Sequence, residues 1–262
     1  QVQIFYDGLH NNASGVACLL IIAEQMKDIT PAYDVVLVAF GASSDDFAGA
    51  RAFADQLSWE EVSSTDVMYC IESIYAGDKL YASAGHNSLE PDRKYERRRK
   101  LYEAYDVVYN NMLRSKNNVD LLYNMSSLVI DVNGDDQLDI YREVTMTQSD
   151  YVPFDELNIP IVFIESYDYN YGRFEDMKET RNLNLQDEGG YIRGTLLDAS
   201  ELLLDELGEE LLIARINNTA FIIFEAIKKG AHDILSQSDY DGGQRLPTAH
   251  EVSQVQTDRG FS

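Results

Sequence analysis

The chain has 262 residues, of which 45% are hydrophobic, enough to bury the core of one α/β domain. Its 45 acidic and 21 basic residues give a formal net charge of −24, which repels nucleic-acid phosphates and anionic lipid head groups. The charge suggests calcium or a basic protein as partner, although an acidic surface is more often simply solvated. The net charge therefore argues against a nucleic-acid partner. No stretch reaches the roughly 20 apolar residues of a membrane-spanning helix, so membrane insertion is not expected either.

The first part of the chain alternates between strand and helix patterns. Residues 2–6 alternate like a strand, and residues 14–27 carry apolar side chains at helical spacing. Residues 33–40 (YDVVLVAF) are almost all apolar, which is typical of a strand covered on both faces. A helix is predicted over residues 45–56 and another central strand over residues 66–73. This order predicts a parallel sheet with crossover helices.

The second part adds strands, a hairpin and long helices. Residues 78–84 and 160–166 are predicted as strands, and residues 90–116 as a long charged helix. Residues 127–132 and 138–144 flank the turn NGDD and predict a hairpin. The last predicted elements are helices at 196–207 and 209–235. We therefore expect one domain over residues 1–235 and a loosely ordered polar tail over residues 236–262.

The one basic cluster, Arg97 to Lys100, lies on the long helix among acidic residues. Charges of opposite sign at three- and four-residue spacing form ordinary intrahelical pairs. The cluster is therefore interpreted as a solvated helix face rather than a nucleic-acid site.

Four segments, taken together, match the order and separations of a known family: HNNASGVACLL, FGASSDDFAGA, MYCIESIYAG and QSDYVPFDELNIPIVFIES. They resemble the bacterial two-zinc aminopeptidases, a family that also includes glutaminyl cyclases and the ectodomain folds of transferrin receptor and nicastrin. The resemblance covers roughly residues 2–84 and 140–230. It implies a three-layer α/β/α fold with a mostly parallel central sheet, truncated at the amino end because the family builds further strands before its first motif.

The resemblance also places the family's metal ligands on altered positions. The first histidine ligand falls on Phe5, while the supporting aspartate is kept as Asp7. The bridging aspartate falls on Asn11, whose neutral amide supplies no charge to hold two zinc ions. The Glu-Glu pair, general base and ligand, falls on Ser43 and Ser44, whose hydroxyls neither take the proton nor replace a carboxylate.

Two further ligand positions complete the comparison. Glu72 stands in place of a strand-end aspartate and keeps a carboxylate able to bind metal. The second histidine falls on Tyr151, after Ser149 and Asp150. No zinc cofactor is therefore expected. A rearranged set that would prefer calcium or magnesium consists of Asp7, His10, Asp45, Glu72, Asp150 and Glu165.

A candidate calcium loop lies in the predicted hairpin. Oxygen side chains occupy the first, third, fifth and ninth positions of an EF-hand-like loop: Asp131, Asn133, Asp135 and Asp139. The sixth position is Asp136 instead of glycine, and the twelfth is Arg142 instead of glutamate. An Asn-Gly hairpin turn explains the same residues, so both interpretations stay open.

These substitutions lead to three hypotheses about function. The first is that the chain is not an enzyme but a catalytically inactive, aminopeptidase-like protein that binds a protein partner or assembles with itself. The alternatives are an active metallo-aminopeptidase with a rearranged metal site and a filament-forming structural subunit. Seventeen tyrosines suit an interface, and an unprotected edge strand is a template for pairing. The sequence begins at Gln1 rather than methionine, which fits three explanations: a signal peptide has been removed, the chain comes from a larger precursor, or this sequence starts late in its protein. We expect an extracellular or cell-surface location.

Overall fold

The structure is a computed structural model, and it describes residues 7–90, 93–117, 121–123, 128–130, 139–141, 143–169 and 177–229. The α-helices in these ranges are α1 (Ser14–Met26), α2 (Ala48–Ala54), α3 (Trp59–Ser64), α4 (Lys94–Asn110), α5 (Leu113–Asn117), α6 (Val152–Glu156), α7 (Ser200–Leu207) and α8 (Glu209–Lys229). The strands are β1 (Met68–Ile71), β2 (Lys79–Ser83), β3 (Leu121–Tyr123), β4 (Leu128–Ile130), β5 (Asp139–Tyr141) and β6 (Ile161–Tyr167).

The central sheet has four described strands in the order β1-β6-β2-β3. β1 runs parallel to β6, with Cys70 opposite Phe163, and β2 runs parallel to β3. Only the contact between β2 and β6 is antiparallel. The expectation of a mostly parallel sheet is confirmed, and β4 and β5 form a separate antiparallel pair where the hairpin was predicted.

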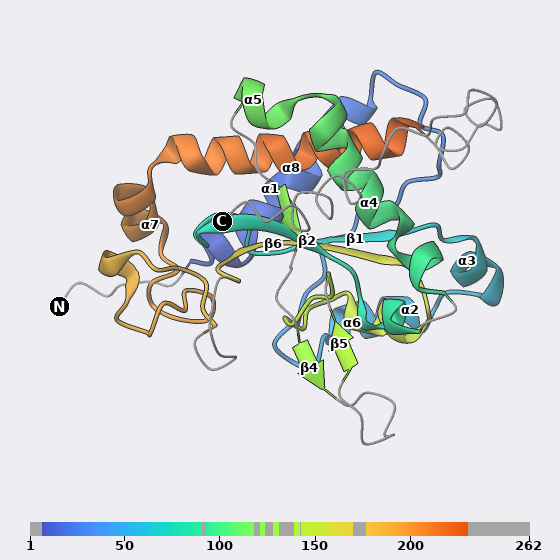
Figure 1. The fold of residues 1–262 in the computed structure, drawn as a ribbon, viewed down its shortest axis with the longest axis horizontal. Helices are drawn as coiled ribbons and strands as arrows, with labels where there is room; N and C mark the ends of the chain where they lie inside the picture. Colours follow the sequence, from blue (N-terminus) through green and yellow to red (C-terminus); the bar gives the residue numbers. More distant parts are fainter. Residues whose placement is uncertain are drawn as a thin grey trace.

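Helices cover both faces of this sheet (Figure 1), which confirms the three-layer α/β/α architecture. The fully buried strand β6 shows why the layers form, because its side chains alternate between the two faces. Val162 and Ile164 join the core against α1, α4 and α8. Ile161 and Phe163 join the core against α2 and α6. β6 is therefore the central strand that both cores share.

The strongest sequence patterns predict their elements closely. The helix expected over residues 14–27 is α1, the strand expected over 160–166 is β6, and the strand expected over 66–73 contains β1. The predicted strand over residues 2–6 and the whole predicted tail over residues 236–262 lie outside the described residues, so the division of the chain at residue 235 stays a prediction. No described helix combines the length and the apolar character needed to cross a membrane.

The prediction of a strand covered on both faces at residues 33–40 is wrong. The segment has no regular secondary structure, and no described strand pairs with it. Val35 and Phe40 pack inward against the two cores, whereas Val36 is 72% exposed and Leu37 is 39% exposed. The apolar run thus lies at the margin of the fold, where only one of its faces meets the core.

The interpretation of the basic cluster as a solvated helix face is also wrong. The predicted helix over residues 90–116 is divided into α4 and α5 around Met112, which has a left-handed backbone (φ 53°). Arg98 and Lys100 of α4 are buried, because carboxylates from elsewhere in the chain meet them. Arg98 pairs with the buried Glu143 at 3.1 Å, and Lys100 pairs with Asp66 at 3.2 Å. Such pairs replace the water that the charges lose.

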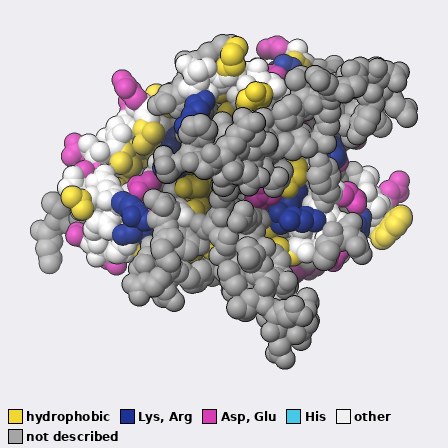
Figure 2. Space-filling model, in the orientation of Figure 1, with side chains coloured by type: hydrophobic (Ala, Val, Ile, Leu, Met, Phe, Trp, Pro, Cys, Tyr) yellow, Lys and Arg dark blue, Asp and Glu magenta, His cyan; other side chains and the backbone are white. Residues whose placement is uncertain are grey.

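Acidic side chains are dispersed on the face of the molecule that Figure 2 shows. In the face shown in Figure 2, Asp and Glu side chains are spread among other side chains rather than gathered on one element. This distribution gives a long-range negative potential rather than one anion-repelling patch.

Candidate functional site

Two carboxylates meet where β1 and β6 end. Ile71 lies opposite Ile164 in the parallel register, so Glu72 and Glu165 lie side by side one position further on. Carboxyl ends of parallel strands meet at one edge of a sheet, where ligand sites of α/β folds form. Side chains two residues apart share a face of a strand, so Glu72 and Glu165 lie on the same side as Cys70 and Phe163.

A third carboxylate, Asp150, reaches this edge from the loop before α6. Sγ of Cys70 contacts Oγ of Ser149 at 3.6 Å, which holds the loop against β1. The next residue, Asp150, accepts a hydrogen bond from Oγ of the exposed Ser43 at 2.7 Å through its Oδ2. Its other oxygen, Oδ1, is buried without a hydrogen-bond partner among the described residues.

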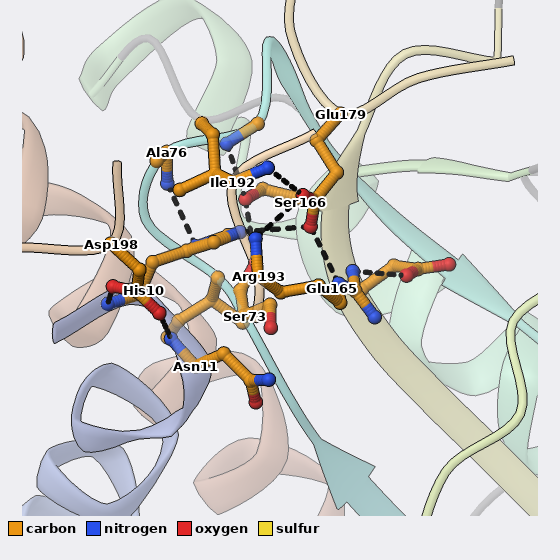
Figure 3. Close-up of polar contacts among 12 residues, drawn as sticks. His10, Asn11, Ser73, Ala76, Glu165, Ser166, Glu179, Ile192, Arg193 and Asp198 are labelled. Carbon is orange, nitrogen blue, oxygen red and sulfur yellow. Dashed lines mark hydrogen bonds and ion pairs between the residues drawn. The ribbon is translucent and has the colours of Figure 1, made fainter. Parts of the chain in front are cut away.

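Beside these carboxylates lies an ion-pair network around Arg193 (Figure 3). Nη2 of Arg193 donates to Glu165 at 2.9 Å, and Nε donates to Glu179 at 2.5 Å. His10 completes the network, since its Nδ1 accepts from the backbone N–H of Ala76 at 3.1 Å and its Nε2 donates to Glu179 at 3.1 Å. His10, Glu165 and Glu179 are buried.

Burial sets the proton affinities of the carboxylates. Desolvation raises the pKa of Glu72 to about 7, because the nearby charges of Glu165 and Asp150 add to it and Arg193 only partly opposes it. Burial likewise raises the pKa of Asp150, against the hydrogen bond from Ser43. Glu179 behaves oppositely: burial acts to raise its pKa, but the hydrogen bond from His10 and the charge of Arg193 hold that pKa well below its usual range. Glu72 is thus the carboxylate that exchanges a proton near neutral pH.

The structure brings together only some of the residues singled out from the sequence. Ser43, Glu72, Asp150 and Glu165 converge at the sheet edge, as described above. Ser44 and Asp45 lie exposed in the loop before α2. Phe5 lies outside the described residues.

The remaining predicted residues have structural roles. Asp7 accepts the backbone N–H of Ser200 at the start of α7. The backbone N–H of Asn11 donates to Asp198 at 2.9 Å. Tyr151 is buried in the core, and its hydroxyl donates to the carbonyl oxygen of Thr147.

Sequence reasoning missed Glu179 and Arg193, which come from loops without a periodic pattern. The signal that could have found Arg193 is charge: it is a lone basic residue in an acidic stretch. The candidate calcium residues Asp131, Asn133 and Asp135 lie outside the described residues, and of Asp139 only the backbone, in β5, is described. The calcium loop therefore stays a prediction.

The described donors do not fit a two-zinc centre. Within the described ranges, no group of three or more His, Cys, Asp or Glu side chains is arranged to hold a metal ion. Both ring nitrogens of His10 are engaged, and two of the nearby carboxylates, Glu165 and Glu179, are taken by Arg193. Two zinc ions need imidazole and carboxylate ligands that are free to bind them.

Comparison with known proteins places the chain. Residues 2–187 match the model of peptidase family M28. The chain belongs to this family. It is 24% identical over 165 residues to the alkaline phosphatase isozyme conversion protein of Escherichia coli (strain K12), an alignment that covers 63% of this chain and 42% of that relative. The chain therefore spans less than half the length of its curated relative.

Solved structures agree on the fold. An aminopeptidase from Aneurinibacillus sp. strain AM-1 is similar with a TM-score of 0.50 and 18% identity, over 85% of this chain and 40% of that chain. The zinc aminopeptidase BSAP from Bacillus subtilis is similar with a TM-score of 0.50 and 18% identity, over 88% of this chain and 44% of that chain. The predicted family and fold are confirmed, as a member whose zinc-ligand positions are altered.

The expectation that the chain is not an enzyme is corrected by its family. The matching family, over residues 2–187, is a family of peptidases. Substituted zinc ligands alone do not establish inactivity, because protein groups such as a carboxylate with a pKa near 7 also transfer protons.

Proposed function

We propose that this member of the peptidase family binds the free amino end of a peptide, with the α-ammonium held between the carboxylates of Glu72 and Asp150. The observation that carries the proposal is a pair of largely buried carboxylates with unused acceptors. No hydrogen bond or ion pair joins the Glu72 carboxylate to the described residues, and Oδ1 of Asp150 has no partner among them. An ammonium offers three N–H donors, enough to satisfy both.

The electrostatics support a cationic ligand in particular. Burial and neighbouring carboxylates raise the pKa of Glu72 to about 7, so near neutral pH its carboxyl group is partly protonated and a nearby cation displaces the proton. Binding of an ammonium lowers this pKa, and the complex then gains a charge-assisted hydrogen bond in a site of low dielectric constant.

The test uses leucinamide, which has a free amine, and N-acetyl-leucinamide, which has none. In isothermal titration calorimetry at pH 7, leucinamide is expected to bind and the acetylated compound is not. Glu72→Gln and Asp150→Asn are each expected to weaken leucinamide binding by about tenfold or more, since each removes a charged acceptor. Repeating the wild-type titration in buffers of different ionisation enthalpy is expected to show net proton release.

The matched control is Glu156→Gln. Glu156 is an exposed carboxylate that pairs with Arg51 on the surface, so its replacement is expected to leave the dissociation constant unchanged. Equal binding of both compounds, or full affinity of the Glu72→Gln variant, would rule out recognition of the amino end by these carboxylates.

A second candidate function is association with a protein partner or a second copy of the chain, outside the cell. It is supported by the margin of the fold: β1 is the last described strand on its side of the sheet, and Val36 and Leu37 expose apolar surface in the segment 33–40. Unpaired sheet edges and exposed apolar residues favour pairing with another chain.

Self-association predicts a mass that rises with concentration. In size-exclusion chromatography with light scattering, the wild-type chain is expected to exceed the 29.7 kDa of one copy, and Val36→Asp is expected to return it toward that value. Trp59→Asp is the control, because Trp59 is 83% exposed on α3, away from the margin segment in sequence. A constant mass of one copy at all concentrations would contradict self-association and leave a different protein as the partner.

A further inference from the structure

One nitrogen of Arg193 remains unused in an otherwise complete network. Nε and Nη2 of this side chain donate to Glu179 and Glu165, whereas Nη1 is buried and has no hydrogen-bond partner among the described residues. Buried donors in proteins are nearly always paired, and a donor left without a partner, ligand or water destabilises the fold. The spare donor therefore needs an explanation.

The surrounding contacts fix the direction of that donor. Glu179 is held by the backbone N–H groups of Ile192 and Arg193 at 2.5 and 2.9 Å, besides His10. Glu165 accepts from the hydroxyl of Tyr169 at 2.5 Å and from Thr147 at 3.2 Å. Both carboxylates are thus rigid, and a planar guanidinium bound to both has no freedom to rotate. Nη1 is preorganised rather than mobile.

Arg193 also supplies the positive charge of the site. Its burial acts to lower its pKa, but the charges of Glu179, Glu165 and Glu72 raise that pKa above its ordinary value. The guanidinium is therefore charged at every pH at which the protein is folded. The charge of Glu72 is one of those that raise the pKa of Arg193, and Glu72 is also one of the two carboxylates assigned to the ammonium. The guanidinium of Arg193 and the proposed ammonium site are therefore neighbours, with Glu72 common to both.

We infer that Nη1 of Arg193 binds the carbonyl oxygen of the first residue of the bound peptide, as the resident cation of a site whose side chains do not fit zinc. This inference rests on the proposed binding of the amino end by Glu72 and Asp150. In an α-amino acid residue, the amine and the carbonyl oxygen are separated by only the α-carbon and the carbonyl carbon. One residue therefore spans an acceptor pair and an adjoining donor. The ligand class is a peptide or amino-acid amide with a free amine.

The experiment separates the carbonyl from the amine. Isoamylamine carries the side chain and amine of leucinamide but no carbonyl group. The wild-type chain is expected to bind leucinamide about tenfold or more tightly than isoamylamine, as a hydrogen bond from a charged donor implies. Arg193→Lys keeps the charge but loses the fixed fork, so this variant is expected to bind the two compounds within about threefold of each other.

The matched control is Arg181→Lys. Arg181 also pairs with a buried carboxylate, that of Asp168, but it belongs to a different ion pair, so the ratio between the two compounds is expected to stay at the wild-type value. A second measurement needs no variant. In protein labelled with ¹⁵N-arginine, the side-chain resonances of Arg193 are expected to shift on addition of leucinamide and not of isoamylamine.

The possible outcomes distinguish the two proposals. Failure of isoamylamine and leucinamide to bind overturns the proposed function and the inference with it. Binding of both with equal affinity, with unmoved Arg193 resonances, overturns the role of Arg193 alone and leaves the amine site standing. A wild-type preference for leucinamide that is lost in Arg193→Lys, together with the selective resonance shift, supports the inference.

Discussion

Replacing Arg193 with methionine is expected to lower the free energy of unfolding by about 3 to 5 kcal/mol, the range measured when one partner of a buried ion pair is removed. The variant leaves Glu165 and Glu179, which are 1% and 0% exposed, without the cation that both contact. Methionine retains most of the apolar volume, so the loss reports charge rather than a cavity. Urea denaturation of both proteins at pH 7.5 measures it.

The pH dependence of this loss has a defined sign. Arg193 lowers the pKa of both Glu165 and Glu179, so its removal makes the folded variant bind protons more tightly than the folded wild type. The wild type therefore gains on the variant as pH rises, and the difference is expected to shrink as pH falls and the orphaned carboxylates of the variant take up protons.

The control for this prediction is an exposed ion pair. Arg93 pairs with Glu96 at 3.0 Å on the surface of α4, so Arg93→Met is expected to change stability by less than about 1 kcal/mol. A loss of that small size for Arg193→Met would mean that water already compensates the two carboxylates, contrary to their burial.

Secondary structure was predictable where the apolar residues follow one clear pattern, either an unbroken run or helical spacing. β6 was found because its buried first half, Ile161 to Ile164, is an unbroken apolar run, and α1 because its apolar residues recur at helical spacing. Residues 33–40 also contain an apolar run but lie at the margin, because an apolar composition favours burial and does not specify a neighbouring strand. The conformation of residues 33–40 is determined by tertiary contacts, which a local sequence pattern does not contain.

The site was only half predictable for a related reason. Glu72 and Asp150 follow recognisable motifs, so their convergence could be inferred from strand order. The place of Arg193 in the site could not be inferred from strand order, because its role depends on Glu165 and Glu179, two carboxylates that lie 28 and 14 residues away in the sequence. The buried pairs of α4 escaped prediction in the same way, because Glu143 and Asp66 reach the helix from other segments. A charge has no periodic signature that reveals a distant partner.

Glu72→Gln is expected to make the protein more stable at pH 8, by about 3 to 4 kcal/mol. Burial raises the pKa of Glu72 to about 7 in the folded chain, against about 4.3 in an unfolded one. Between these values the folded state binds the proton more tightly, so wild-type stability falls as pH rises, by about 1.4 kcal/mol per pKa unit. Glutamine resembles the protonated carboxyl and does not ionise.

Stability curves at pH 4, 6 and 8 test this directly. The two proteins are expected to be nearly equal at pH 4, where the carboxyl is protonated in both folded and unfolded wild type, and to diverge as pH rises. Glu156→Gln, which alters an exposed pair, is expected to show no such divergence. A Glu72→Gln variant that is less stable than wild type at pH 8 would show that the carboxylate has a stabilising partner. A gain in stability together with a loss of leucinamide binding has one physical reason: the free energy that the fold loses by burying an unpaired carboxylate is recovered only when a cationic ligand occupies the site.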